Sequence, residues 1–199
     1  MRYHSQQSED IYLHNKFFNY RDGFFIELGA MDGVEYSNTK FFEDTLGWTG
    51  ILIEPTYQYQ WLVRNRPNCK NYNYAISLTE GEVDFAGYGA LGGIVNTLSP
   101  SHIKAWGINV ANSYKVKSIP IRNLLTDVKK VDFFSVDVEG GEYDVLQTYD
   151  WNIPTYIVLI ELHEPEKNQL CRDFLISKGF EFDATVGANE VWVNKAFKK

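Results

Sequence analysis

Short apolar runs alternate with amphipathic stretches along most of the chain. The runs predict buried strands at Phe24–Leu28, Gly50–Ile53, Tyr72–Ile76, Val131–Val138 and Tyr156–Leu162. Apolar residues at helical spacing predict helices over residues 6–18, 37–46, 57–64, 142–149 and 166–178. This alternation of strand and helix is typical of a parallel sheet with right-handed crossovers.

Residues 77–120 interrupt the alternation. Their glycines and short apolar groups predict hairpins and a mobile loop. Val116–Ile121 is predicted to be an edge strand, because Pro120 has no N–H for a sheet ladder. Further on, FEFDAT (180–185) and EVWVN (190–194) predict a closing antiparallel hairpin. The sequence therefore predicts one doubly wound α/β domain over residues 1–199, with a mostly parallel twisted sheet and helices on both faces.

Composition narrows the partners and the compartment. Lysine and arginine total 19 against 26 aspartates and glutamates, so the formal charge is −7, which argues against a nucleic-acid partner. The polar first ten residues lack the apolar core of a signal peptide, and no apolar run reaches membrane-spanning length. The two cysteines lie far apart and form no metal or disulfide motif. The chain is predicted to be cytoplasmic, without a membrane partner.

Acidic residues stand at the ends of predicted strands, at Glu27, Glu54, Asp137 and Glu161. The carboxyl ends of parallel strands meet at one edge of the sheet, where ligands bind at the point of reversal in strand order. Carboxylates gathered there repel one another, and a ligand or a cation would hold them together. We interpret this rim as functional, although any one of these acids alone is explained by helix capping or ion pairing.

The stretch FFIELGAMDG (24–33) combines a strand, an acid and a G-x-x-x-G turn. Met31 stands where the dinucleotide fingerprint needs a glycine to approach a pyrophosphate, which disfavours an NAD-dependent oxidoreductase. Glu54 is placed to accept hydrogen bonds from both hydroxyls of a ribose. A ribose-bearing cofactor without a pyrophosphate points to S-adenosylmethionine, whose positive sulfonium suits an acidic pocket. The glycine pair by itself is explained by a tight turn.

Residues 24–55 and VDFFSVDVEGGEYDVLQ (131–147) carry a family resemblance. Besides the glycine turn, the motifs are Ser37–Asn38–Thr39, Gly47–Trp48–x–Gly50, Ile53–Glu54–Pro55, Arg66–Pro67 and Asp137–Val138–Glu139–Gly140. With these motifs the chain resembles the FkbM family of S-adenosylmethionine-dependent methyltransferases, from about Ser5 to Glu161. The family often has Asp at the position of Glu27 and Asn at that of Met31. The resemblance implies a Rossmann-like class I methyltransferase fold in a single methyltransferase domain.

The resemblance also implies a set of cofactor-binding residues, namely Glu27, Gly29, Ala30, Asp32, Gly33, Ser37, Asn38, Glu54, Ala75, Ile76, Ser77 and Asp137. Residues 27–33 would form the cofactor turn, Glu54 would hold the ribose, and residues 75–77 would flank the adenine. Ser37 and Asn38 could reach the methionine carboxylate, and Ser37 could instead cap the following helix. Asp137 would lie beside the methionine moiety, close to the transferred methyl.

Methyl transfer to oxygen requires alignment of the reacting atoms and removal of the hydroxyl proton. The expected catalytic residues are Asp137, His163 and Glu161. Either His163, which we favour, or Asp137 would act as the base; alternatively, His163 bonds a neighbouring loop. A second mechanism has Asp137 and Glu161 bind a divalent cation, Mg or Mn, that lowers the hydroxyl pKa. Glu139 is expected to turn away and brace its loop, and His102 to be exposed.

The resemblance favours a carbohydrate or natural-product hydroxyl as acceptor, and we expect a sugar hydroxyl of a glycan. The alternatives are a small-molecule O-methyltransferase and a non-catalytic nucleotide-binding module whose acidic rim serves a partner. The glycine-rich insert at residues 87–106 is expected to form a lid over the acceptor, with Tyr88, His102 and Trp106 against the sugar. The small size is compatible with a piece of a larger enzyme fused to glycosyltransferase domains.

Overall fold

The computed structural model describes residues 1–163 and 165–197. A seven-stranded sheet forms its centre, in the order β10-β11-β9-β8-β1-β2-β3. The strands are β1 (Phe24–Leu28), β2 (Thr49–Ile53), β3 (Lys70–Tyr72), β8 (Val131–Val136), β9 (Thr155–Glu161), β10 (Phe180–Val186) and β11 (Asn189–Asn194). The five strands from β3 to β9 run parallel, and β11 pairs antiparallel with both β9 and β10. The predicted C-terminal hairpin is therefore confirmed.

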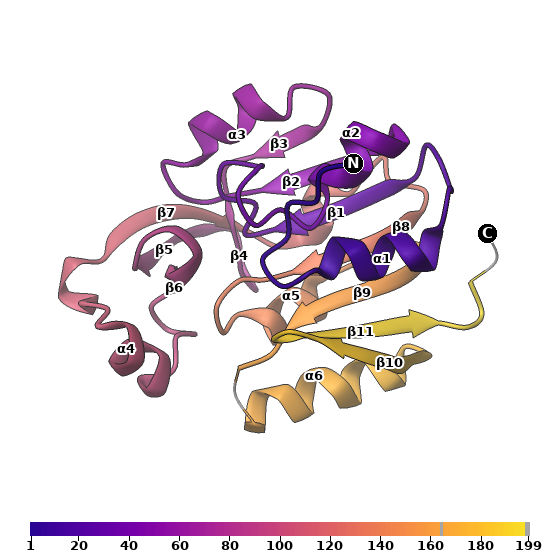
Figure 1. Ribbon diagram of the computed structural model, residues 1–199. Helices are drawn as coiled ribbons and strands as arrows, with labels where there is room; N and C mark the ends of the chain where they lie inside the picture. Colours follow the sequence, from indigo (N-terminus) through magenta and orange to yellow (C-terminus); the bar gives the residue numbers. More distant parts are fainter. Residues whose placement is uncertain (164, 198–199) are drawn as a thin grey trace.

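Helices cover both faces of this sheet (Figure 1). They are α1 (Glu9–Phe17), α2 (Lys40–Leu46) and α3 (Tyr59–Asn65) on one face, and α5 (Glu142–Thr148) and α6 (Pro165–Ser177) on the other. Successive strand residues alternate between the two layers: Phe25 packs with Phe41 of α2, whereas Ile26 packs with Val145 of α5. The near-continuous apolar runs in the sequence are explained by this burial on both faces.

A second, smaller sheet projects beside the first, at the left of Figure 1. Its order is β4-β7-β5-β6, with β4 (Ala75–Ile76), β5 (Gly81–Ala86), β6 (Gly93–Ile94) and β7 (Tyr114–Ile119). The same region carries helix α4 (Pro100–Trp106) and the 3₁₀ turns η1 (Gly89–Leu91), η2 (Val110–Asn112) and η3 (Ile121–Leu124). It thus contains more regular structure than the predicted hairpins and mobile loop.

Two strand predictions in this region were wrong. Val116–Ile121 is not an edge strand, because β7 pairs with β4 on one side and β5 on the other. Pro120 follows the last residue of β7, so its missing N–H interrupts no ladder. The predicted strand Tyr72–Ile76 is divided between β3 and β4, which belong to different sheets. A run of alternating apolar residues does not reveal that the chain changes sheets in its middle.

The strand order places the candidate site. The chain leaves β1 towards β2 and β3 on one side, and β8 leads to β9 on the other, so the order reverses between β1 and β8. The register pairs Leu28 with Ile53 and Val136 with Ile160, so these four strands end at the same edge. This arrangement confirms the doubly wound, Rossmann-like class I methyltransferase fold, whose ligand crevice lies at this edge. No helix in the described residues is long and apolar enough to cross a membrane.

Candidate active site

A pocket opens at the carboxyl ends of β1, β2, β8 and β9. Its lining includes the acids predicted for the rim: Glu27, Glu54, Asp137 and Glu161. One wall comes from the small sheet and its η1 turn, including Ile76, Phe85, Gly89, Ala90 and Gly92. Another comes from the N-terminal segment, through Gln6 and Glu9. The insert therefore contributes residues to the pocket wall, but Tyr88 and Trp106, expected against the acceptor, are absent from the lining and are exposed.

The turn after β1 requires its two glycines. Gly29 has φ +69°, and a Cβ there would lie 2.2 Å from the backbone oxygen of Asp137. Gly33 has φ +79°, and a Cβ there would lie 2.6 Å from Cγ of Arg66. Asp32 holds the turn by accepting the backbone N–H groups of Val34 and Glu35, both at 2.8 Å. Gly29 therefore sets the approach of β1 to β8, and neither Asp32 nor Gly33 lines the pocket.

A buried arginine lies beneath this turn. Arg66 is 0% exposed; its guanidinium pairs with Glu43 and donates to the backbone oxygen of Gly33 at 3.0 Å. It also donates to the hydroxyls of Ser37 and Thr39, at 3.2 and 2.9 Å. One cation thus connects α3 to the glycine turn and to the start of α2.

Glu27 is held by the same network. Its carboxylate lies 3.8 Å from Arg66 and accepts the hydroxyls of Ser37 and Thr39 and the N–H of Asn38. Burial raises its pKa, and Arg66 and these hydrogen bonds oppose the rise. Ser37 also accepts the backbone N–H of Lys40, the first residue of α2. This contact fits the helix-capping alternative for Ser37.

The side-chain oxygen of Asn38 has no hydrogen-bond donor among the described residues. Its side-chain amide donates to the hydroxyl of Ser135 at 3.0 Å, while its Oδ1 is buried and accepts no hydrogen bond among the described residues. Asn38 lines the pocket. A buried carbonyl oxygen without a donor is unfavourable, so this atom suits a ligand that brings an N–H or O–H group.

Glu54 is fixed at the end of β2. It is 4% exposed and accepts the backbone N–H groups of Met31 at 3.0 Å and Thr56 at 2.8 Å, one on each oxygen. Burial raises its pKa, and these hydrogen bonds oppose the rise. Each carboxylate oxygen can accept a second hydrogen bond, so the oriented group retains acceptor capacity for a diol.

The residues predicted to flank an adenine separate into two groups. Ala75 and Ile76 of β4 are buried and line the pocket, close to Phe85 and Ile94 of the small sheet. Ser77 is not in the lining, and its hydroxyl donates to the backbone oxygen of Thr79 at 2.7 Å. The apolar wall suits the face of a flat ring, and Ser77 holds the turn that follows β4.

Asp137 and Glu161 meet at the far end of the pocket. Asp137 directly follows β8 and Glu161 ends β9, the neighbouring strand. Their carboxyl groups are hydrogen-bonded to each other, which requires a proton between them. Burial and the charge of Glu161 raise the pKa of Asp137 well above its usual range. Burial opposes the ionisation of Glu161, but hydrogen bonds from His163 and Asp137 lower its pKa overall.

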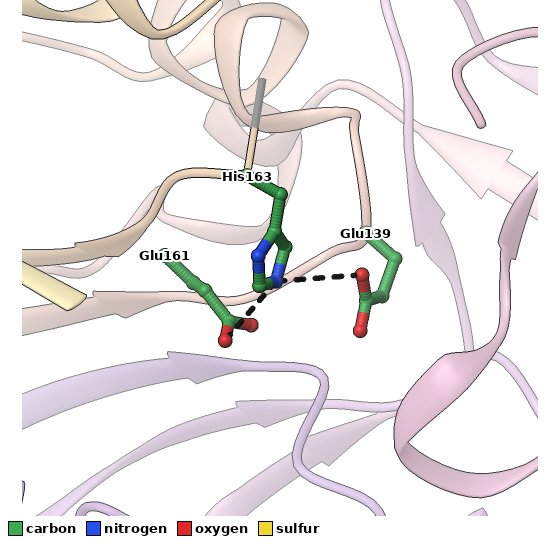
Figure 2. Close-up of side chains that lie close together, drawn as sticks. All are labelled: Glu139, Glu161 and His163. Carbon is green, nitrogen blue, oxygen red and sulfur yellow. Dashed lines mark ion pairs between the residues drawn. The ribbon is translucent and has the colours of Figure 1, made fainter. Parts of the chain in front are cut away.

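His163 stands between two carboxylates. Figure 2 shows its ring nitrogen facing the gap between Glu161 and Glu139. The Nε2 atom lies 3.1 Å from Oε1 of Glu161 and 3.8 Å from Oε2 of Glu139. The hydrogen bond with Glu161, together with the neighbouring acids, raises the pKa of His163 to about 9. The imidazole is then cationic at neutral pH, which differs from the unperturbed base near pH 6.5 expected from the sequence.

Glu139 and His102 were placed wrongly from the sequence. Glu139 does not turn away; it lines the pocket, and burial together with the charge of Glu161 raises its pKa to about 8. His102 is not exposed; its side chain is 10% accessible, with Nδ1 3.4 Å from Glu139. The only sequence signal for Glu139 is its position directly before Gly140 and Gly141, and no local signal marks His102 as a site residue. The folding of the small sheet brings α4 back to the β8–α5 loop.

Strained backbone accompanies these side chains. Met31, Tyr36 and Glu139 have φ values of 49°, 59° and 53°, and all three line the pocket. Non-glycine residues rarely adopt this left-handed conformation, which costs about 1–3 kcal/mol each when the surroundings impose it. Asn adopts it more readily than Met, which explains why Asn suits the position of Met31. Ser8, Phe18 and Asp22 also have positive φ but lie outside the pocket lining; strained residues at a pocket are typical of functional sites.

The comparisons with known proteins identify the family. The model of the methyltransferase FkbM domain matches residues 27–182, which is most of the chain. No curated protein matches it.

The chain is also similar to solved structures from three organisms. A precorrin-6Y C5,15-methyltransferase from Geobacter metallireducens is 9% identical, with coverage of 92% of this chain and 85% of that one and a TM-score of 0.49. A methyltransferase from Pyrococcus furiosus is 13% identical, with 98% and 88% coverage and a TM-score of 0.48. A SAM-dependent methyltransferase from Aquifex aeolicus is 10% identical, with 94% and 90% coverage and a TM-score of 0.47.

The family match confirms the resemblance in the sequence and the cofactor inferred from the turn after β1. The chain belongs to the FkbM methyltransferase family and is an S-adenosylmethionine-dependent methyltransferase.

Proposed function

We propose that this methyltransferase acts on oxygen and that its acceptor is a sugar hydroxyl, most simply one of a glycan. The observation that carries the proposal is the carboxylate pair Asp137–Glu161 at the strand ends, inside the same pocket as Glu54 and the glycine turn. A sugar hydroxyl is a weak acid, so its methylation requires a nearby group that takes up the proton.

The cofactor fits the residues present. Glu54 would accept hydrogen bonds from the ribose hydroxyls, and the apolar wall at Ala75 and Ile76 would face the adenine. The unpartnered Oδ1 of Asn38 would accept from the ammonium group of the methionine end. When bound, S-adenosylmethionine supplies an electrophilic methyl, whose bond to sulfur breaks with the electron pair left on sulfur, giving S-adenosylhomocysteine.

The chain contributes positioning and proton transfer. The glycine turn and Glu54 hold one end of the pocket fixed, which aligns a bound acceptor for in-line displacement. As the new bond to the acceptor oxygen forms, the carboxylates of Asp137 and Glu161 take up the hydroxyl proton. The pKa of Asp137 is raised well above its usual range and that of Glu161 is lowered, so the pair holds one proton and retains one carboxylate that can accept the hydroxyl proton.

Two features of the pocket favour a sugar. Tyr36 lines it with 44% of its surface exposed, and an aromatic ring packs well against the apolar face of a pyranose. Gln6 and Glu9 bring polar groups to the same side of the pocket. A small natural-product hydroxyl is the second candidate, because the half-open apolar wall of the small sheet would also accept a flat ring.

A transfer assay tests the proposal. The chain would be incubated with S-adenosylmethionine and panels of saccharides, phenols and amines of similar size, and methylated products would be identified by mass spectrometry. We expect methyl ethers of saccharides with matching release of S-adenosylhomocysteine. Methylated amines with unmodified saccharides would refute the assignment to oxygen. Cofactor binding without any turnover would favour the non-catalytic module.

The cofactor contact of Glu54 is tested separately by calorimetry. Glu54→Gln should weaken S-adenosylhomocysteine binding by about tenfold to a hundredfold, because a charged double acceptor contributes roughly 1.5–3 kcal/mol. Glu35→Gln replaces an exposed carboxylate of the same pocket and should leave the affinity unchanged. Equal affinities of the two variants would remove Glu54 from the site.

A further inference from the structure

A buried carboxylate oxygen faces the gap beside His163. Glu139 is 8% exposed, yet its Oε2 accepts no hydrogen bond from any described residue. Two imidazole nitrogens lie near it, Nδ1 of His102 at 3.4 Å and Nε2 of His163 at 3.8 Å. A buried carboxylate without a donor is costly in its charged form, so the position suits a positive partner that stabilises the charge.

The groups around this oxygen have the spacing of metal ligands. One ligand atom each from Glu139, Glu161 and His163 lies within 4.8 Å of the others. The pair formed by His163 Nε2 and Glu161 Oε1 is 3.1 Å apart. Two atoms bound to one tetrahedral ion at about 2.1 Å each lie about 3.4 Å apart, so a small contraction would bring all three onto a shared ion.

We propose that Glu139, Glu161 and His163 bind one divalent first-row transition-metal ion. The three residues come from the β8–α5 loop, the end of β9 and the residues after it, so the fold brings them together independently of any ligand. Figure 2 shows both carboxylates and the ring nitrogen converging on one space. This set of ligands differs from the cation site considered from the sequence, which consisted of Asp137 and Glu161.

The donor set selects the class of metal. Imidazole nitrogen with two carboxylate oxygens suits Zn²⁺, Mn²⁺ or Fe²⁺, whereas Mg²⁺ prefers oxygen alone in a nearly ideal octahedron. Asp137 is engaged with Glu161 by a hydrogen bond, so it acts outside the ligand set and orients one ligand. His102 lies near the same oxygen of Glu139 as His163, with its Nδ1 3.4 Å from Oε2, so it can help to orient this carboxylate.

The role of the ion rests on the proposed O-methylation. Three protein ligands leave at least one coordination position open, as in catalytic zinc sites. Glu139 and Glu161 both line the cofactor pocket, so the acceptor hydroxyl could occupy that position. Coordination would lower the pKa of the hydroxyl, and its proton would pass to the Asp137–Glu161 pair, with no change in oxidation state. Metal binding itself does not depend on this role.

Binding is measured first, without reference to activity. The full chain, stripped with chelator, would be titrated with Zn²⁺, Mn²⁺ and Mg²⁺ by calorimetry, and the Mn²⁺ complex would be followed by electron paramagnetic resonance. We expect one Zn²⁺ per chain, bound at least about a hundredfold more tightly than Mg²⁺. Failure of Zn²⁺ to bind, or equal affinity for Mg²⁺, would overturn the proposed site.

Variants locate the ion. His163→Gln changes a side chain that is 42% accessible, so the fold should persist, and it should weaken Zn²⁺ binding by about a hundredfold or more. Glu139→Gln should do the same, whereas Glu35→Gln, on the same pocket, should match the wild type. Zn²⁺ should raise the melting temperature of wild type and Glu35→Gln but not of His163→Gln. Unchanged Zn²⁺ affinity in folded His163→Gln would place the ion elsewhere and refute the site.

Activity separates the role from the site. If the ion activates the acceptor, chelation should abolish methyl transfer, Zn²⁺ or Mn²⁺ should restore it, and cofactor affinity should stay constant. Full turnover in chelator would refute the catalytic role of a metal that still binds. Absence of oxygen methylation with every acceptor, despite normal Zn²⁺ binding, would count against the proposed function and leave the metal site standing.

Discussion

Replacing Arg66 removes the only guanidinium that contacts the turn after β1 among the described residues. Arg66→Met keeps the length and the apolar stem of the side chain but removes its charge. The stem is 0% exposed, and the lost contacts are the ion pair with Glu43, the nearby Glu27 and the hydrogen bonds to Gly33, Ser37 and Thr39. The variant would leave two carboxylates in a buried setting without their cation.

The magnitude follows from that imbalance. Removing one partner of a buried ion pair costs about 3–5 kcal/mol, because the remaining charge loses its compensation. With a urea m value of about 2 kcal/mol/M, the unfolding midpoint should fall by roughly 2 M. Arg64→Met is the matched control, since Arg64 lies in α3, two residues before Arg66, but is exposed, 4.9 Å from the centre of the Trp61 ring. Its replacement should cost about 0.5–1 kcal/mol.

Urea denaturation followed by circular dichroism measures both variants. The double variant Arg66→Met/Glu27→Gln should recover part of the loss, because it removes one of the stranded charges. A loss below about 1 kcal/mol in Arg66→Met would show that the network does not stabilise the turn. Equal losses of unfolding free energy in Arg66→Met and Arg64→Met would lead to the same conclusion.

Three further predictions concern the pocket. Gly29→Ala would place a methyl 2.2 Å from the backbone oxygen of Asp137, so calorimetry should show S-adenosylhomocysteine binding weakened by about tenfold or more. The control is Gly107→Ala, at φ +62° with no atom within 4 Å, which should cost only backbone strain and leave the affinity for S-adenosylhomocysteine unchanged. Tyr36→Ala should raise the KM of the acceptor about tenfold at constant cofactor affinity, and Trp106→Ala, outside the pocket lining, should not; a matching effect of both would remove Tyr36 from the acceptor site. In chelator, the melting temperature should fall as pH rises from 6.5 to 9.5. The pKa of His163 is raised from 6.5 to about 9 and that of Glu139 from 4.5 to about 8, so the stability that comes from their bound protons is lost as pH passes those values. If the melting temperature of His163→Gln fell as steeply with pH as that of the wild type, His163 would not be the source of this pH dependence.

The sequence alone determined the scaffold and the chemistry of the rim. Runs such as Phe24–Leu28 and Tyr156–Leu162 are apolar on both faces, which only a covered parallel sheet accommodates. Glu27, Glu54, Asp137 and Glu161 stand at strand ends, and strand ends of one parallel sheet necessarily share an edge. These properties depend on local pattern and on a general rule of topology, so the sequence is sufficient to predict them.

The tertiary structure decided which side chains meet. Glu139 lies beside Glu161 and His163 with a backbone φ of 53°, a conformation that the local sequence did not predict. His102 approaches Glu139 because the small sheet brings helix α4 back towards the loop after β8. The sequence did not predict this sheet, because it gave no sign that the chain changes sheets between β3 and β4. Arg66 donates a hydrogen bond to the backbone oxygen of Gly33 in the glycine turn, although the two residues are 33 positions apart in the sequence. Local sequence encodes backbone preference, whereas contacts between distant segments and the pKa values they impose exist only after the chain has packed.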